Sequence, residues 1–395
     1  MPDHRDVVIT SAVRTPIGSF NGTLATLRAP ELGSMVIKEA LQRANIPPEK
    51  VSEVIMGNVL PAGVGQAPAR QASIYAGLPT FVGCTTINKV CGSGLKAVML
   101  ATQSIRLGDS DIVIAGGMES MSNVPYYLPK ARFGYRMGNG EIIDGMVHDG
   151  LWDVYNDFHM GMAGEVCAEE CQIPRNVQDE FAVMSYNRAI EAQNKGYFTE
   201  EIIPVTVKVK GGEKLVDQDE EPSRVKFEKI PSLRPAFKKN GTITAANASK
   251  INDGASALAV MGADVAEKMG VVPMARIIAY STAAQDPEWF TTAPADAIKL
   301  LLEKTGLEKE QVDLYEINEA FAVVTLAVNL LVGLDPGKVN IAGGAVALGH
   351  PIGASGARIL TTLLYNLKRT GGKRGIAAIC LGGGEAVAVL VEMLS

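Results

Sequence analysis

The strongest constraint on the fold is an internal repeat, in which the second half of the chain carries motifs of the first half in the same order. A helical pattern around Ile37 recurs with an offset of 298 − 37 = 261, and Ser93-Gly94 recurs with an offset of 355 − 93 = 262. A third match, from Ile114 to Glu119, has an offset of 380 − 114 = 266. Glycine turns recur by chance in proteins of alternating strands and helices, but three matches in one order favour duplication of one α/β domain.

Within the first half, short apolar strands alternate with segments that place apolar residues at helical spacing. Strands joined by helices run parallel and are covered on both faces. The sequence therefore predicts an α/β fold with a mostly parallel, two-sided sheet. The predicted strands are Val7–Ser11 (with a loop from Ala12 to Pro16), Val54–Met56, Thr85–Val90 and Ile112–Ala115, and the predicted helices are 30–45, 69–76 and 95–107.

A region of different character separates the two halves. Aromatic, glycine and proline residues are interspersed there, followed by an amphipathic helix over Ile173–Lys195 and a charged run over Lys208–Lys229. We interpret that run as solvent-exposed surface, and its cations also make it a candidate phosphate-binding site. A chain of 395 residues is long enough for two or three domains. We predict an N-terminal half (1–119 and 250–273), an inserted domain (120–249) and a C-terminal half (274–395).

Composition excludes several functional classes. The formal net charge is −6, so no basic surface for nucleic acid is expected. No apolar run approaches a membrane span, and no secretory or transit signal precedes the strand at Val7, so we expect a cytoplasmic protein without membrane partners. Five cysteines, an odd number, argue against a disulfide framework. Cys167 and Cys171 lack two further zinc ligands, so we interpret them and Cys84 as packed side chains and expect no metal.

The glycine-rich stretch from Gly343 to Gly356 holds the only histidine in the second half of the chain, His350, and leads into an apolar helix. Such a loop lets the backbone approach a ligand, although a tight turn with an incidental histidine remains the alternative. Cys91 ends a predicted strand and opens a helix, and Cys380 ends a strand of the other half. Because ligands bind at the carboxyl ends of parallel strands, the duplication predicts that these three side chains share a cleft.

The residue types in this cleft indicate acyl transfer. A cysteine at a helix N-terminus beside an imidazole is a suitable nucleophile, and the glycines after Cys91 free backbone N–H groups for an oxyanion hole. Asn318, where a strand turns into a helix, is a further hydrogen-bond donor. A hydrolase does not need the second thiol of Cys380. That thiol would suit proton transfer at a carbon beside a carbonyl, which joins acyl transfer to carbon–carbon bond chemistry.

These motifs resemble the thiolase family over the whole chain. Asn88 to Leu95 is similar to its nucleophile motif, Asn318 to Phe321 to its Asn-Glu-Ala-Phe motif, and Gly349-His350-Pro351 and Cys380 to Gly384 to the remaining two. His159-Met160-Gly161, with Glu119 to Pro125 and Asn247 to Ser249, is most similar to the acetyl-CoA C-acetyltransferases, also called acetoacetyl-CoA thiolases. The resemblance implies the thiolase fold: two duplicated αβαβα halves in a five-layer core, with an inserted loop domain.

The resemblance also implies a mechanism. Cys91 would take the acetyl group of acetyl-CoA as a thioester, with His350 as the base. Cys380 would remove a proton from the methyl group of a second acetyl-CoA, so that acetoacetyl-CoA and CoA form reversibly. One oxyanion hole would use His350 and a water held by Asn318, and the other the backbone N–H groups of Cys91 and Gly382. CoA would be a substrate, with no tightly bound cofactor.

The inserted domain would bind CoA, again by resemblance. Arg224 would lie near its adenine and phosphate end and Ser249 near its pantetheine. Family members are dimers or tetramers, and residues 125–140 fall where their tetramerisation loop lies, so a homotetramer is expected. The side chains expected to line the tunnel are Leu151, His159, Met160, Leu233, Phe237, Ala320 and Phe321.

Two departures from the family pattern limit these expectations. Some relatives bind potassium with a tyrosine where this chain has Pro222, so no potassium is expected. The segment Phe290 to Pro294 differs from the Met-Gly-Thr-Gly-Pro of many bacterial members, which leaves the tolerated acyl chain open. A broad-specificity degradative 3-ketoacyl-CoA thiolase is the nearest alternative. A ketoacyl-synthase-type condensing enzyme and a non-catalytic acyl-CoA-binding scaffold are the others, and the sequence does not set the direction of the reaction.

Overall fold

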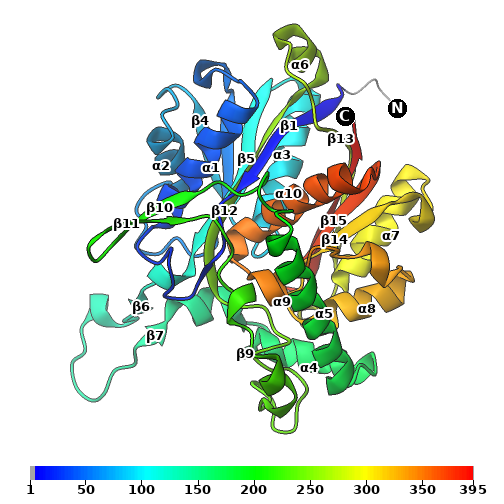
Figure 1. The fold of residues 1–395 in the computed structure, drawn as a ribbon. Coiled ribbons are helices and arrows are strands. Elements are labelled where there is room, and N and C mark those ends of the chain that lie inside the picture. The colour runs from blue at the N-terminus through cyan, green and yellow to red at the C-terminus, as the bar shows by residue number, and fades with distance from the viewer. Residues whose placement is uncertain (1–4, 395) are drawn as a thin grey trace.

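A single sheet runs through the molecule in the computed structural model, which describes residues 5–394. Its first five strands belong to the N-terminal half, and four further strands repeat their arrangement in the C-terminal half (Figure 1). In spatial order the sheet is β4 (Gly83–Ile87), β3 (Glu53–Gly57), β5 (Ile112–Ser120), β12 (Asn252–Gly262), β1 (Val7–Arg14), β13 (Ala275–Ala284), β16 (Glu385–Met393), β15 (Arg374–Leu381) and β14 (Leu314–Ile317), with β2 (Gly18–Ser19) on β12.

The prediction of a mostly parallel sheet is wrong. Only β3 with β4, β3 with β5, and β14 with β15 pair in parallel among the described residues, and the other pairs are antiparallel. Strand β16 follows β15 after the short turn Gly382 to Gly384, and such a hairpin forces antiparallel pairing. Ala12 to Arg14, predicted as a loop, continue β1 opposite β12, and β5 continues through Gly116 and Gly117 to Ser120.

Helices and sheet halves form five layers. Helices α3 (Ser93–Leu107) and α10 (Ile352–Thr370) lie between the two halves of the sheet, and their apolar faces share one core with β5, β15 and β16. Helices α1 (Ala29–Arg43) and α2 (Pro68–Tyr75) cover the outer face of the N-terminal half. Helices α7 (Ala293–Thr305) and α8 (Ala322–Val332) cover that of the C-terminal half (Figure 1). These layers match the five-layer core that the sequence resemblance implies.

The two central helices cross where both have glycine. A Cβ atom on Gly94 would lie 2.7 Å from the backbone nitrogen of Ala357, and one on Gly356 would lie 2.4 Å from that of Leu95. Because 356 − 94 and 357 − 95 both equal 262, the contact is reciprocal and supports the duplication. The helices can approach this closely because glycine has no side chain at the crossing point.

The third sequence match has the wrong register. Val113 lies opposite Glu53 on β3, and Gly375 lies opposite Leu314 on β14, so the true offset in these strands is 375 − 113 = 262. Cys380 therefore corresponds to Met118, since 380 − 118 is also 262, and not to Ile114. The earlier match aligned two glycine pairs that occupy different places, one inside β5 and one in the turn after β15.

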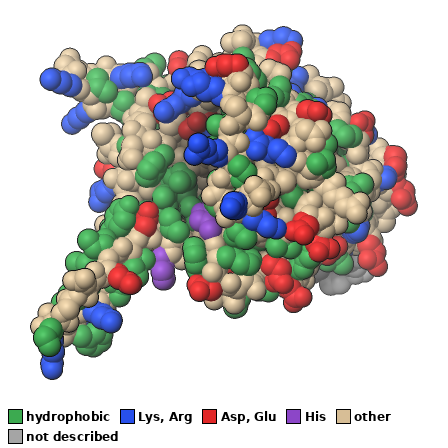
Figure 2. Space-filling view, turned by 90° about the horizontal axis from the view of Figure 1, so that it is seen from below, with side chains coloured by type: hydrophobic (Ala, Val, Ile, Leu, Met, Phe, Trp, Pro, Cys, Tyr) green, Lys and Arg blue, Asp and Glu red, His purple; other side chains and the backbone are tan. Residues whose placement is uncertain are grey.

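The segment between β5 and β12 forms several small units. The loop between β6 and β7 extends away from the body as an arm that carries hydrophobic side chains (Figures 1 and 2). Our domain boundaries in this region remain a prediction. Its elements are β6 (Tyr126–Tyr127), β7 (Ile143–Asp144), β8 (Trp152–Asp153), β9 (Phe158–His159), α4 (Met160–Glu170), α5 (Arg175–Asn194), β10 (Val205–Val209) and β11 (Gly212–Val216); α6 (Ala263–Met269) and α9 (Ala345–Leu348) complete the helices.

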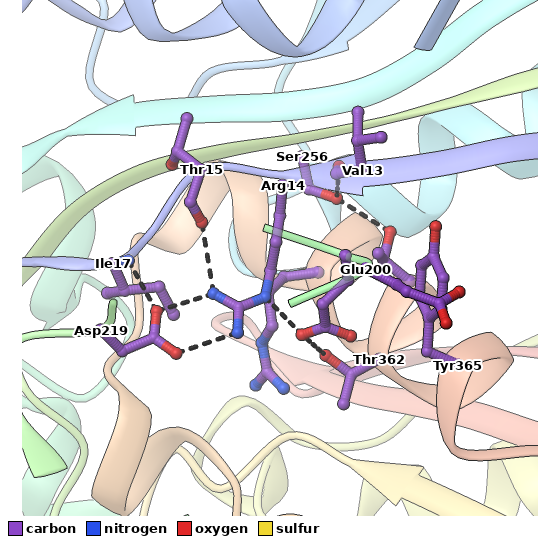
Figure 3. A network of polar contacts seen from close by, with 12 residues as sticks. Val13, Arg14, Thr15, Ile17, Glu200, Asp219, Ser256, Thr362 and Tyr365 are labelled. Carbon is purple, nitrogen blue, oxygen red and sulfur yellow. Dashed lines mark hydrogen bonds and ion pairs between the residues drawn. The ribbon is translucent and has the colours of Figure 1, made fainter. Parts of the chain in front are cut away.

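A buried ion-pair network ties this inserted segment to the core. Arg14, at the end of β1, contacts Asp219 at 2.7 Å (Figure 3). It also contacts Glu201 at 2.6 Å, and all three side chains are excluded from solvent. Thr362 of α10 donates a hydrogen bond to the same Glu201 carboxylate. Burying charges is costly unless they are paired, so the network fixes how the insertion sits on β1 and α10.

Candidate active site

A mainly apolar pocket of about 290 Å³ lies where the N-terminal ends of the two central helices meet the inserted segment. Hydrophobic side chains border a hollow beside histidine side chains at this end of the molecule (Figure 2). The lining residues are Val90, Cys91, Met121, Gly150, Leu151, His159, Met160, Phe237, Ala248, Ser249, Lys250, Ile251, Phe290, Ala320, Phe321, His350, Ile352 and Gly382.

Cys91 projects from a strained loop between β4 and α3. The residue before it, Val90, has φ +46°, a left-handed conformation that a β-branched side chain rarely adopts. The Ser93 hydroxyl holds this turn by donating to the Val90 carbonyl at 2.6 Å and by accepting from the Lys89 N–H at 2.8 Å. Burial raises the pKa of the Cys91 thiol to about 12, while the N–H groups of Gly382 and of Cys91 itself oppose that shift. Cys91 is therefore a thiol at rest.

His350 is held as a neutral base. Its backbone N–H donates to Asn252 Oδ1 at 2.9 Å, and its Nδ1 lies 2.6 Å from Ser355 Oγ. Because the Ser355 hydroxyl donates its hydrogen bond to the Pro351 carbonyl, Ser355 Oγ accepts a hydrogen bond from the Nδ1–H of His350, which leaves the Nε2 lone pair free. Nε2 is buried without a hydrogen-bond partner, and burial lowers the pKa of His350 to about 3.

Cys380 lies behind this pair, at the end of β15. It is fully buried beside Met160, Phe290 and Phe321. Burial raises its pKa well above the ordinary value, and the proximity of the Cys91 sulfur raises it further. Cys380 is thus a protonated thiol close to the nucleophile, and it does not itself line the pocket.

Asn318 is the most unusual polar side chain here. It is fully buried, and neither its Oδ1 nor its Nδ2 has a hydrogen-bond partner. An unsatisfied buried amide costs about 1–3 kcal/mol, so its retention indicates a partner from outside the chain, such as a water or a substrate carbonyl. Its backbone is fixed by donation from its N–H to the Ala378 carbonyl at 3.0 Å.

The predicted CoA-binding residues divide into two groups. Leu151, His159, Met160, Phe237, Ser249, Ala320 and Phe321 all line the pocket. The His159 ring stacks on Phe237 with centroids 4.6 Å apart, and its Nδ1 caps α4 by accepting from the Gly161 N–H. Arg224 and Leu233 lie outside the pocket, on and just after the 3₁₀ turns of the inserted segment, and Arg224 is exposed. Leu233 was predicted to line the tunnel and does not line this pocket.

Two residues support the site although the sequence does not predict a role for them. Asn252 holds the His350 backbone, but only an Asn-Asp-Gly sequence marks it. Glu119 accepts hydrogen bonds from the backbone N–H groups of Val59, Leu60 and Gly353 and from Asn58, which joins β5 to the start of α10. Burial raises the pKa of Glu119 to about 7. Glu119 begins the motif Glu119 to Pro125, but that motif does not by itself indicate this supporting role.

The remaining cysteines are neither paired in disulfides nor grouped around a metal in the part of the chain that the structure describes. Cys167 and Cys171 have sulfurs 4.0 Å apart, and all five cysteines are free thiols. Among residues 5–394, no group of three or more His, Cys, Asp or Glu side chains is arranged to hold a metal ion. In the same part of the chain, no helix has the length and apolar character needed to cross a membrane.

Comparison with known proteins gives one consistent result. The family description "Thiolase, N-terminal domain" matches residues 7–264, and "Thiolase, C-terminal domain" matches residues 271–393. Acetyl-CoA acetyltransferase 2 of Arabidopsis thaliana is 55% identical over 99% of this chain and 98% of its own. The Acat5 thiolase of Ascaris suum, solved in complex with coenzyme A, is 46% identical with a TM-score of 0.94, covering 99% of this chain and 100% of its own. The Bacillus anthracis acetyl-CoA acetyltransferase is 43% identical with a TM-score of 0.97, covering 99% of each chain.

Proposed function

The chain belongs to the thiolase family, and from this premise we propose that it is an acetyl-CoA C-acetyltransferase, which joins two acetyl-CoA molecules into acetoacetyl-CoA and CoA in a reversible Claisen condensation. The observation that carries the proposal is the pairing of a neutral thiol, Cys91, with a neutral imidazole, His350, in one apolar pocket that also has the buried thiol of Cys380 beside it. No tightly bound cofactor is needed.

In the first half-reaction, Cys91 Sγ attacks the carbonyl carbon of acetyl-CoA. The thiol proton passes to the free Nε2 of His350, and the oxygen gains negative charge next to the backbone N–H groups of Cys91 and Gly382. The carbon–sulfur bond to CoA then breaks, and His350 returns the proton to the departing sulfur. The acetyl group is left as a thioester on Cys91.

In the second half-reaction, Cys380 transfers a proton. Its thiol first gives its proton to Nε2 of His350, and the resulting thiolate removes a proton from the methyl group of a second acetyl-CoA. The enolate oxygen is then held by the protonated His350 and by the free amide of Asn318, directly or through a water. The enolate carbon attacks the Cys91 thioester, a carbon–carbon bond forms, and the Cys91 sulfur leaves and takes the proton back from His350. Thiolysis follows the same steps in reverse, so metabolite levels set the direction.

The pocket favours a short acyl group. It encloses only about 290 Å³, and Met160, Phe290 and Phe321 are among the side chains that line it. Such a pocket accommodates the acetyl and pantetheine groups, whereas a long acyl chain needs further room. This supports the acetyl-specific activity over a broad-specificity degradative 3-ketoacyl-CoA thiolase.

Two measurements test the activity. Incubation with labelled acetyl-CoA followed by peptide mass spectrometry should find the acetyl group on Cys91, and the absence of that adduct would contradict the mechanism. Comparison of thiolysis rates for acetoacetyl-CoA and a long-chain 3-ketoacyl-CoA should show strong preference for acetoacetyl-CoA. A preference for the long chain would make the degradative enzyme the better description.

We also propose a homotetramer and a cytoplasmic location. The arm between β6 and β7 exposes large apolar side chains, among them Phe133 at 84% and Met137 at 96%, which a partner arm would cover. Light scattering should give a tetramer that becomes a dimer when the arm is shortened. Five free thiols suit a reducing compartment such as the cytoplasm, and cell fractionation checks that location.

A further inference from the structure

Lys250 lines the pocket but takes no part in the proposed mechanism. Its side chain is half-buried, and its ammonium donates to the backbone carbonyl of Ala248 at 2.7 Å and to that of Val346 at 3.3 Å. These carbonyls belong to segments almost a hundred residues apart in the chain. The ammonium therefore bridges two walls of the site instead of extending into solvent, as lysines usually do.

The surroundings of the ammonium form a basket that suits a cation. Besides the two carbonyl oxygens, the Tyr186 ring lies with its centroid 5.6 Å from Lys250 Nζ. The carboxylates of Glu221 and Glu319 favour the charged form, although burial lowers the pKa of Lys250 to about 8. Carbonyl dipoles, an aromatic face and carboxylates all stabilise positive charge, and none of them requires a primary amine in particular.

The first wall is the segment 247–250. It pairs with the Asn-Glu-Ala-Phe segment, since the Ser249 N–H donates to the Ala320 carbonyl at 2.9 Å and the Ala322 N–H donates to the Asn247 carbonyl at 2.8 Å. Ser249 and Ala320 both line the pocket. A shift of this segment would move the wall on which the pantetheine of CoA is proposed to lie.

The second wall is helix α9, which leads directly into His350. Val346 is held at both of its backbone polar groups: its N–H donates to Glu319 Oε2 at 3.1 Å, and its carbonyl accepts from Lys250. One turn later the Gly349 N–H donates to the Ala345 carbonyl, and His350 follows. The position of the catalytic imidazole thus depends on where α9 is anchored.

We propose that the Lys250 ammonium is the built-in cation of this site, a positioning residue that clamps the 247–250 segment to α9 and so fixes Ser249 and His350 relative to each other. The inference rests on the proposed function, because it concerns the geometry of that same reaction. It implies that the basket recognises a univalent cation of about the size of an ammonium group. The substitution Lys250→Ala then leaves a space that free ammonium or potassium occupies.

The experiment compares Lys250→Ala with Lys250→Met in buffers whose only added cation is tetramethylammonium, which is too large for the basket. We expect kcat/KM for acetoacetyl-CoA thiolysis to fall by about 10- to 100-fold in both variants, because a displacement of ~1 Å in a catalytic group costs about 10²-fold. Added potassium or ammonium should restore most of the activity of Lys250→Ala. Lys250→Met should not recover, because its side chain fills the same space without a charge.

The controls separate this effect from packing and ionic strength. The full-length unsubstituted protein should respond little to the choice of cation, and Lys238→Ala, which removes an exposed lysine paired with Glu169 in the same inserted segment, should behave like it. Full activity of Lys250→Ala in tetramethylammonium would overturn the proposal, as would a loss that potassium and ammonium do not relieve. If Lys250→Ala folds only with potassium or ammonium, the clamp is supported. Failure of the proposed function would show separately, as an unsubstituted protein that takes no acetyl group on Cys91.

Discussion

The two halves of the molecule use equivalent serine residues at the cleft, but these serines hold different chemical groups in place. At the start of each central helix stands a serine, Ser93 in α3 and Ser355 in α10, related by the offset of 262. The Ser93 hydroxyl holds the backbone of the loop that presents Cys91, whereas the Ser355 hydroxyl holds the imidazole of His350. One inherited hydrogen-bonding position therefore fixes the proposed nucleophile in one half and the proposed base in the other.

The strand ends differ in the same way. Met118 on β5 and Cys380 on β15 occupy equivalent positions, but Met118 packs in the outer core against Gly33 of α1. Cys380 packs against Met160 and Phe321, which come from the inserted segment and the Asn-Glu-Ala-Phe motif. The comparison shows that the symmetric scaffold places a residue at each strand end, and that the asymmetric insertion packs against only one of them, Cys380.

The largest expected effect comes from the nucleophile. Cys91→Ala should lower both acetyl exchange between acetyl-CoA and labelled CoA and condensation by about 10⁴-fold or more, because both half-reactions pass through the same sulfur. Radiolabel exchange and coupled condensation assays measure the two losses. Exchange that survives in Cys91→Ala would mean that the N-terminal half does not supply the nucleophile.

The second effect distinguishes the two strand ends. Cys380→Ser should lower condensation by about 10²- to 10⁴-fold, because it removes the proton acceptor, while acetyl exchange on Cys91 is largely retained. Met118→Leu, at the matching position, should leave both rates nearly unchanged and cost less than about 1.5 kcal/mol in the free energy of unfolding. Equal losses of exchange and condensation in Cys380→Ser would remove the division of labour between the halves.

The two serines give a smaller, paired test. Ser355→Ala should lower kcat/KM by about 10- to 100-fold, because the imidazole loses the partner that fixes its tautomer and orientation. Ser93→Ala should act mainly on stability, lowering the free energy of unfolding by about 1–3 kcal/mol as the Lys89 N–H loses its acceptor. Steady-state kinetics and urea unfolding of both variants separate these outcomes, and identical profiles would show that the serines have the same role.

The last prediction concerns the pH dependence of stability, where the change per pH unit is small. Burial depresses the pKa of His350 from 6.5 to about 3, so the folded state prefers the neutral ring. The resulting stabilisation is complete above pH 6.5 and is lost as the pH falls toward 3, by at most ~1.4 kcal/mol per pH unit for one proton. Unfolding free energies of the unsubstituted protein and His350→Asn between pH 7 and pH 4 should differ in slope by that contribution. Equal slopes would mean that the ring is accessible to protons in the folded state.

Much of the fold followed from local patterns. The central helices, the strand before α3 and the duplication at Ser93 and Ser355 were predictable because periodicity and glycine turns are properties of short stretches of sequence. Strand direction was not, since β12 pairs with β5 only after the long insertion, and no local pattern encodes the direction of such a pairing. The false match at Ile114 arose because glycine pairs look alike in a strand and in a turn.

The sequence by itself determined the duplicated α/β halves, and it predicted the residues of the proposed site, Cys91, His350, Cys380 and Asn318, because each lies in a short and specific motif. Only the tertiary structure decided how those groups are set. The neutral state of the thiol and imidazole comes from burial by distant segments, and the His350 N–H is held by Asn252, 98 residues away. The cation basket around Lys250 likewise exists only where separate segments meet, because hydrogen-bond partners and desolvation are properties of packing.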